Sequence, residues 1–218
     1  MNFQPTTLLS AAFLLSVFPI IFGVASSYLK ISIVLQVLKN ALGLQQSPGI
    51  LAEVVLALAL TGFIMGPIFE EVLPKIKPLV GKGVGSVSSQ EIKDIFAPWL
   101  AFLDRHTGRS ERDFIIRMRA NNSSEKNIID SDIPEESILK WFEVIPAFLL
   151  SELKEALLMG VALLTPFVII DLVVAQLLTG LGMMMVSPTL VALPLKLLLF
   201  AVTNGWILLS ESLILSYQ

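Results

Sequence analysis

The hydrophobic pattern divides the chain into two apolar parts with a polar part between them. Apolar residues dominate up to about residue 73 and again from about residue 145, whereas most charged residues lie between Glu70 and Lys140. An α-helix needs about 20 apolar residues to cross a bilayer. Four stretches approach this length, although several are short or carry a charge: 7–29, 54–69, 156–181 and 188–210.

The first apolar part predicts a helical hairpin. Residues 7–39 can form one long helix, and Gly43 supplies its C-terminal stop. A second helix is expected from about residue 49 to Val72, with a kink at Pro67 and an end before Pro74.

The predicted hairpin has a polar tip and a pair of spaced glycines. The tip contains Gln45, Gln46 and Pro48. Gly62 and Gly66 follow the GxxxG spacing, which permits two helices to approach closely in an apolar setting. This short pattern is weak alone, because glycine is common in such helices.

The polar middle predicts a small helical domain that follows a linker at residues 74–87. Ser88 and Glu91 fit a capping box at the start of its first helix. The apolar residues of that helix recur mostly every three or four positions and are expected to share one face: Ile92, Ile95, Phe96, Trp99 and Leu103.

Two further helices are expected in the middle part, one capped by Ser110 and ending at Met118, the other starting at about Ser131. Residues 120–130 predict a loop, and a new helix is expected near Pro146. The chain is therefore predicted to be all-α, with helical hairpins at residues 1–73 and 145–218 flanking a helical domain at residues 74–144.

A turn interrupts the second apolar part. Gly182 and Pro188 are expected to set its geometry, because glycine tolerates left-handed backbone and proline cannot continue a helix. Between them stand three methionines: Met183, Met184 and Met185. Methionine is unbranched and able to repack, so these residues suit a contact that adapts to changing shapes. The alternative is that they fill a core or face lipid at a helix end.

Asp171 and Lys196 are isolated charges in the same apolar part. An ionisable group there is costly unless it is paired or hydrated. If the helices fold back at the turn, the two residues lie at similar depths, since each residue adds about 1.5 Å to a helix. A structural pair, within one chain or between neighbours, is favoured over an ion relay, which usually needs more than one carboxylate.

The composition excludes several classes of protein. The formal net charge of −3 gives no basic field for nucleic acid. Without cysteine, and with His106 as the single histidine, the chain has no thiol chemistry and no His-based metal cluster of its own. No nucleophile–base constellation is evident, so no catalytic, cofactor or metal site is expected. The N-terminus lacks the basic region of a cleaved signal peptide and is expected to be retained.

Six stretches together resemble the SctR/FliP family, the inner-membrane export-gate proteins of type III secretion systems and flagella. The order and combination of these stretches are specific, and the short N-terminus is more similar to the injectisome branch, a virulence machine, than to the flagellar one. The stretches are 38–48, 145–153, 166–173, 181–188, 193–200 and 205–206.

The resemblance implies an assembly. Five copies would join four SctS-like subunits, one SctT-like subunit and further export-apparatus proteins in a pseudo-helical cone around a channel for unfolded polypeptides. The cone would sit in the inner membrane, in contact with lipid and with much of its mass at periplasmic level, where the middle domain would lie. Met183, Met184 and Met185 would form the gasket of that channel.

Two other functions remain open from the residues. Interrupted apolar helices on both sides of a polar domain also occur in secondary transporters for small solutes, although the two halves share no obvious sequence repeat. An intramembrane enzyme is the third possibility, and the lack of cysteine and of an apolar-region histidine speaks against it.

Overall fold

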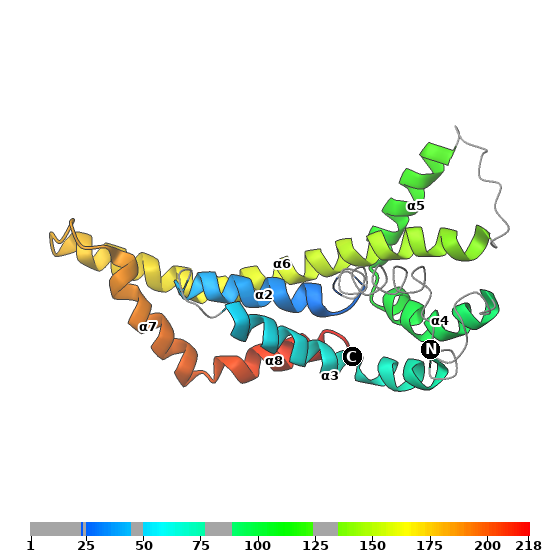
Figure 1. The fold of residues 1–218 in the computed structure, drawn as a ribbon. Coiled ribbons are helices and arrows are strands. Elements are labelled where there is room, and N and C mark those ends of the chain that lie inside the picture. The colour runs from blue at the N-terminus through cyan, green and yellow to red at the C-terminus, as the bar shows by residue number, and fades with distance from the viewer. Residues whose placement is uncertain (1–22, 24, 45–49, 77–88, 124–134) are drawn as a thin grey trace, which may run out of the picture. The chain divides into compact units, whose positions relative to one another are not determined.

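The computed structural model describes residues 23, 25–44, 50–76, 89–123 and 135–218. These residues contain no strand and confirm the all-α prediction (Figure 1). Their helices are α2 (Tyr28–Ala41), α3 (Ile50–Ile76), α4 (Ser89–Arg105), α5 (Arg109–Ser123), α6 (Glu135–Gly180), α7 (Pro188–Val202) and α8 (Gly205–Leu215). The hairpin-tip residues Gln45, Gln46 and Pro48 lie outside the described residues.

Two described helices are long and apolar enough to cross a membrane. They cover Leu51–Ile76 in α3 and Glu143–Gly180 in α6. Helices α7 and α8 together form a third candidate span, although they are bent by 63° relative to each other. These features and the family described below indicate a membrane protein.

The chain divides into two compact units. Unit 1 contains residues 1–29 and 65–152, and unit 2 contains residues 30–64 and 153–218. Helices α3 and α6 each contribute to both units. The predicted division into 1–73, 74–144 and 145–218 describes placement relative to a membrane and stays a prediction.

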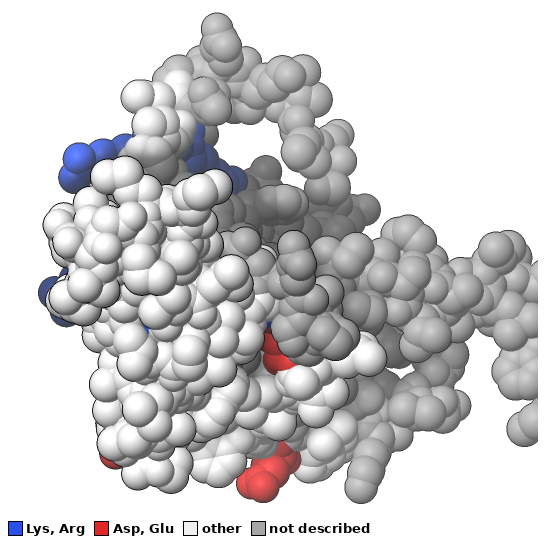
Figure 2. Space-filling view, turned by 90° about the vertical axis from the view of Figure 1, so that its left-hand side faces the viewer, with Lys and Arg blue, Asp and Glu red and all other residues white. Residues whose placement is uncertain are grey.

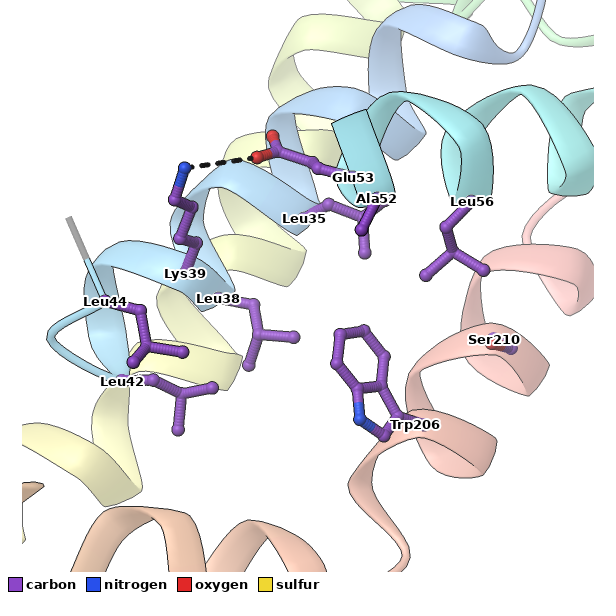
Figure 3. Close-up of a pocket in the computed structure, with 10 residues that line it drawn as sticks. All are labelled: Leu35, Leu38, Lys39, Leu42, Leu44, Ala52, Glu53, Leu56, Trp206 and Ser210. Atoms are coloured by element: carbon purple, nitrogen blue, oxygen red, sulfur yellow. Dashed lines mark ion pairs between the residues drawn. The ribbon is translucent and has the colours of Figure 1, made fainter. Parts of the chain in front are cut away.

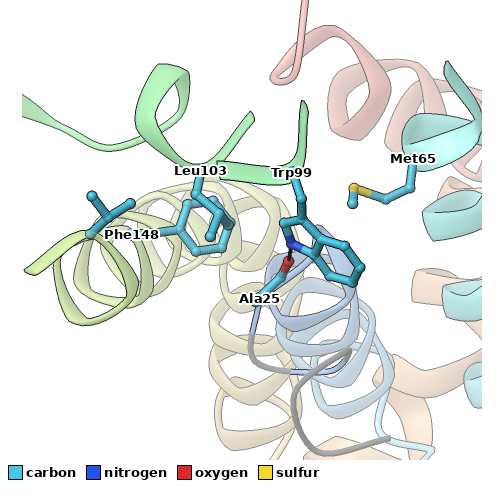
Figure 4. Packing of buried hydrophobic residues seen from close by; sticks show 6 residues of the cluster. Ala25, Met65, Trp99, Leu103 and Phe148 are labelled. Carbon is cyan, nitrogen blue, oxygen red and sulfur yellow. Dashed lines mark hydrogen bonds between the residues drawn. The ribbon is translucent and has the colours of Figure 1, made fainter. Parts of the chain in front are cut away.

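The core of unit 1 forms where α4 packs against α6 and the end of α3 (Figure 4). Trp99 and Leu103, one turn apart on α4, are buried with Met65, Val144 and Phe148. Full burial of each large apolar side chain contributes about 1.5–3 kcal/mol. The indole nitrogen of Trp99 also donates a 2.6 Å hydrogen bond to the carbonyl oxygen of Ala25.

Polar contacts complete unit 1. Arg119 on α5 pairs with Glu143 on α6 at 2.9 Å, and Arg112 pairs with Asp104 of α4. The hydroxyl of Ser151 accepts a 2.9 Å hydrogen bond from the backbone N–H of Gly108. These polar contacts connect α5 to its neighbours, since three of its large apolar side chains, Phe114, Ile116 and Met118, remain exposed.

Unit 2 is built around α2, whose buried face follows the helical spacing Ile31, Val34, Leu35 and Leu38. Figure 1 shows α2 beside α6. The approach is close at Gly160 of α6, where a Cβ atom would come within 3.3 Å of the Val37 side chain. In contrast, a Cβ atom on Gly62 or Gly66 would meet nothing within 4 Å, so the GxxxG pair makes no close contact with another helix among the described residues.

Two predicted helix ends near prolines are wrong. Helix α6 runs without interruption through Pro146, and α3 continues through Pro74 to Ile76. A proline in a helix loses one backbone hydrogen bond but keeps a helical φ angle. In α6 this loss is offset by the burial of Val144, Ala147 and Phe148 on either side of Pro146.

The predicted continuous helix over residues 7–39 is also wrong within its described part. The backbone bends at residues 25–27 before α2 begins at Tyr28. The Ser26 hydroxyl accepts a hydrogen bond from the backbone N–H of Tyr28 at 3.2 Å. Serine side chains that bind nearby backbone groups compete with helix formation, which explains the break.

Other boundaries differ in smaller ways. Helix α5 extends to Ser123, so residues 120–123 are helical where a loop was predicted. On α4, Ile95, Trp99 and Leu103 are buried as predicted, whereas Phe96 is exposed. Phe96 therefore lies off the buried face, because its position follows Ile95 directly and points about 100° away from it.

The break between α7 and α8 was not predicted. Asn204 adopts a left-handed conformation with φ of 51°, and any Cβ atom on Gly205 would overlap the ring of Phe200. The Phe200 and Trp206 rings then meet edge to face, with centroids 5.2 Å apart. Glycine at position 205 therefore lets Phe200 fold over the start of α8.

We predict that Trp99→Phe lowers the free energy of unfolding by about 1–3 kcal/mol, because the buried carbonyl of Ala25 loses its donor. Thermal unfolding of the detergent-purified full chain, followed by circular dichroism, measures this effect. Trp206→Phe is the matched control, because its side chain is half exposed. An equal loss in both variants would contradict the assigned role of the hydrogen bond.

Candidate functional site

The turn between α6 and α7 has a defined backbone. The N–H of Met183 donates to the carbonyl of Leu178 at 2.9 Å, and the N–H of Gly182 donates to that of Thr179 at 3.0 Å. These two bonds form a Schellman motif, which requires a left-handed residue at the position of Gly182. Gly182 supplies it with φ of 76°.

The start of α7 completes the turn. Ser187 has an extended backbone at the N-cap position, and Pro188 is the first helical residue. Proline suits that position because its missing N–H would have no partner there, and its φ angle is already helical. Gly182 and Pro188 thus bracket the methionines, one ending α6 and the other starting α7.

The three methionines project from this turn. Met183 and Met184 are 47% and 81% exposed, and Met185 is fully exposed. They are not core residues of this chain. Figure 2 looks from the side on which the turn lies in Figure 1, and most of the described surface facing the viewer is uncharged, with blue and red side chains in a few places. The turn is therefore a hydrogen-bonded backbone that carries soft, apolar side chains.

A buried cation connects the turn's two helices to α2. The ammonium group of Lys196 on α7 lies 2.6 Å from a carboxylate oxygen of Asp171 on α6. It also donates a 2.9 Å hydrogen bond to the carbonyl of Ala41, the last residue of α2. A cation at the C-terminal end of a helix is favoured by the helix dipole. The structure thus brings Asp171 and Lys196 together within one chain.

The same carboxylate has a second oxygen without a partner. Oδ1 of Asp171 is buried and accepts no hydrogen bond within the described part of the chain. A buried acceptor left unpaired costs about 1–3 kcal/mol. The pair with Lys196 therefore stabilises the charge of Asp171 but leaves one of the two carboxylate oxygens without a hydrogen bond among the described residues.

A second buried lysine occupies the other end of α2 and was missed in the sequence. Lys30 is 1% exposed, pairs with Glu155 of α6 at 2.7 Å, and lies 4.0 Å from the centre of the Tyr217 ring. Lys30 stands out as a charge after a long apolar run, which was the available signal. Its partners lie 125 and 187 positions away, and no local pattern connects them.

No group of three or more His, Asp or Glu side chains in the described part of the chain is placed to hold a metal ion. The ring of His106 contacts the carbonyl oxygen of Phe102, one turn earlier on α4, through Nδ1 at 2.8 Å. The turn and the Asp171–Lys196 pair near its base present the apolar methionine side chains at the surface.

Comparison with known proteins identifies the family. A sequence model of the FliP family matches residues 11–213. The chain belongs to the FliP family. This confirms the resemblance read from the six stretches, and the match includes the turn and both members of the Asp171–Lys196 pair.

Curated relatives of this FliP-family chain align along nearly its whole length. The virulence protein YscR of Salmonella typhimurium is 36% identical over 215 residues, covering 99% of this chain and 98% of the relative. The harpin secretion protein HrcR of Erwinia amylovora is 36% identical over 220 residues, with the same coverage. The Yop proteins translocation protein R of Yersinia pestis is 34% identical over 211 residues, covering 94% of this chain and 92% of the relative.

We predict that Lys196→Met lowers the free energy of unfolding by about 3 kcal/mol, because it leaves the Asp171 carboxylate without its cation. Asp171→Asn in the same chain should restore part of this loss. Denaturant unfolding of the two single variants and the double variant measures the coupling. Glu211→Gln, an exposed carboxylate on α8, is the control. Strictly additive losses would show that the two side chains do not depend on each other.

Proposed function

We propose that this chain is a core subunit of a type III secretion export gate and that its α6–α7 turn is the gasket of the export channel. The observation that carries the proposal is the exposure of Met183, Met184 and Met185 on a turn whose backbone is fixed by Gly182 and Pro188. The names of the relatives, which refer to harpin secretion and Yop protein translocation, support the assignment to protein secretion.

The side chains suit a seal that opens for a polypeptide. A constriction lined by apolar side chains excludes water and ions by dewetting. Thioether chains are flexible and polarizable, so they can contact an unfolded chain of any sequence. A ring of β-branched residues would close equally well but adapt less, because rotation about χ1 is restricted.

The contacts of Lys196 with Asp171 and Ala41 hold the seal in place. Asp171 lies 9 residues before the end of α6, and Lys196 lies 8 residues after the start of α7. Their ion pair closes the base of the hairpin, and the bond to Ala41 connects that base to α2. The methionines can then move while the helices that carry them remain fixed.

The exposed surface of unit 2 requires partners. Large apolar side chains remain exposed along the second half of α6, among them Leu157, Leu158, Val161, Ile169, Leu172, Val173 and Leu177. Extended exposed apolar surface marks contacts with membrane or protein. We assign them to lipid of the inner membrane and to other subunits: four further copies of this chain, four SctS-like subunits and one SctT-like subunit in a pseudo-helical cone.

In this assembly the subunit acts as a passive conduit. The polar residues 74–144 lie at periplasmic level in the wall of the cone, and other components supply the energy for export. The alternative, a transporter for a small solute, is disfavoured because the relatives are named for protein secretion and translocation.

We predict that replacing Met183, Met184 and Met185 together by alanine raises the leak of ions and small solutes several-fold without preventing assembly. Alanine leaves a wider opening because it removes the flexible side chains that close it. Permeability of cells or vesicles that contain the complete complex measures the effect. In the control, alanine replaces three exposed apolar residues of α7 outside the turn: Leu195, Leu197 and Leu198. Unchanged permeability in the methionine variant would reject the gasket.

We expect native mass spectrometry of the full chain to give a pentamer, which gains small hydrophobic subunits when the neighbouring membrane-protein genes are co-expressed. The physical reason is that the exposed apolar faces of unit 2 need protein partners. A persistent monomer or dimer under both conditions would reject the assembly and favour the transporter.

A further inference from the structure

Unit 2 contains a cavity of about 390 Å³ between α2, α3 and α8, and no residue of the methionine turn lines it (Figure 3). Its volume lies in the range of about 300–1,000 Å³ that is common for ligand pockets. Five leucines and one tryptophan form most of its wall: Leu35, Leu38, Leu42, Leu44, Leu56 and Trp206.

The cavity favours an apolar occupant over water. A buried water needs two to four polar partners, and leucine walls offer none. Among the described lining residues, polar groups are limited to the side chains of Lys39, Glu53 and Ser210 and the indole N–H of Trp206. An apolar group that reaches the cavity from its surroundings would therefore occupy it.

An ion pair defines one edge of the cavity. The ammonium nitrogen of Lys39 lies 3.8 Å from a carboxylate oxygen of Glu53, and these side chains are 19% and 21% exposed. Figure 3 shows this pair on one side of the cavity and the Trp206 ring on the other. This separation is longer than the about 2.7–3.2 Å of a hydrogen bond. The ammonium and the carboxylate can therefore still form hydrogen bonds with another partner.

This edge lies where a membrane span would begin. Glu53 is in the first turn of α3, whose residues Leu51–Ile76 form a candidate span. Charged side chains at the end of a span reach the headgroup region of a bilayer. Next to the cavity, Leu51 and Val55 are 78% and 64% exposed, so the apolar wall continues onto the outer surface of α3.

We propose that this cavity binds one acyl chain of a zwitterionic phospholipid whose headgroup carries a primary ammonium. The lipid phosphate pairs with Lys39, the lipid ammonium donates to Glu53, and the chain fills the space between the leucines and Trp206. Because lipid tails are as apolar as leucine, moving a tail into the cavity gives little preference by itself. The headgroup contacts therefore decide which lipid is bound.

The size of the cavity favours a hydrocarbon chain over a helix of another protein. A helix with its side chains is about 10–12 Å wide and rises 5.4 Å per turn, so one turn occupies on the order of 400 Å³. The cavity, at about 390 Å³, is thus comparable in volume with a single helical turn. A flexible acyl chain can occupy it without any change in the three helices.

Trp206 provides the test, because lipids with brominated acyl chains quench tryptophan fluorescence on contact. The full chain is reconstituted in vesicles that contain a small fraction of brominated phosphatidylethanolamine, phosphatidylcholine or phosphatidylglycerol with identical acyl chains. The signal of Trp206 is the difference between the unchanged chain and Trp206→Phe. We expect brominated phosphatidylethanolamine to associate about threefold more strongly than the other two, as weak charge contacts at a partly exposed site allow.

Variants assign this preference to the ion pair. The double variant Lys39→Gln with Glu53→Gln should lose the preference while quenching by all three lipids persists. Glu70→Gln, an exposed carboxylate of α3 that does not line the cavity, should keep it. Ala52→Phe places a ring in the cavity wall and should reduce quenching by all three lipids, provided that circular dichroism shows a folded chain.

Three results would overturn the proposal. Equal quenching by the three lipids would show ordinary surface lipid beside an exposed tryptophan. A preference that survives in the double variant would place the headgroup elsewhere. In the complex co-expressed with its neighbouring subunits, loss of Trp206 quenching together with a photo-crosslink from position 52 to another protein would show that a subunit fills the cavity.

Discussion

The buried ammonium group of Lys196 is the contact on which the C-terminal hairpin depends. A charge in an apolar environment is tolerated only when it is paired and hydrogen-bonded. Lys196 meets this condition with Asp171 and with the last carbonyl of α2, so one side chain connects three helices. If any of the three helices moved along its axis, a charge or a carbonyl would lose its partner. The free-energy cost of that loss fixes the register of the hairpin.

In the gasket proposed for this turn, the constraint separates a backbone of defined geometry from side chains that can adapt. The Schellman motif at Gly182 and the helix start at Pro188 fix the backbone of the turn, and the ion pair fixes its base. Movement is left to the methionine side chains. The proposed seal needs this arrangement, because a mobile backbone would lose the closed geometry and stiff side chains would not adapt to different polypeptides.

A second buried cation repeats the principle at the other end of α2. Lys30 pairs with Glu155 and lies against the Tyr217 ring, so both ends of the helix are joined to their neighbours by lysine contacts. Apolar surface alone would not position α2, since apolar helices gain little by choosing one another over lipid. The polar contacts supply the specificity that apolar packing lacks.

Local sequence was sufficient for the features that depend on neighbouring residues. The all-α class, the stop at Gly43 and the place of the exposed methionines follow from periodicity and from glycine and proline, because these act on the backbone within one turn. The charges Asp171 and Lys196 could be matched because both are counted from the same turn. Family resemblance rested on ordered short motifs, which the sequence also carries.

The tertiary structure decided what depends on residues far apart in the chain. The burial of Val144, Ala147 and Phe148 carries α6 through Pro146, where the proline alone predicted an end. Phe200 folding over Gly205 breaks the last apolar stretch, and Gly160 rather than the GxxxG pair allows close approach to α2. In each case packing against distant residues outweighs a local preference of a few kcal/mol at most. Only the folded chain brings those distant residues together.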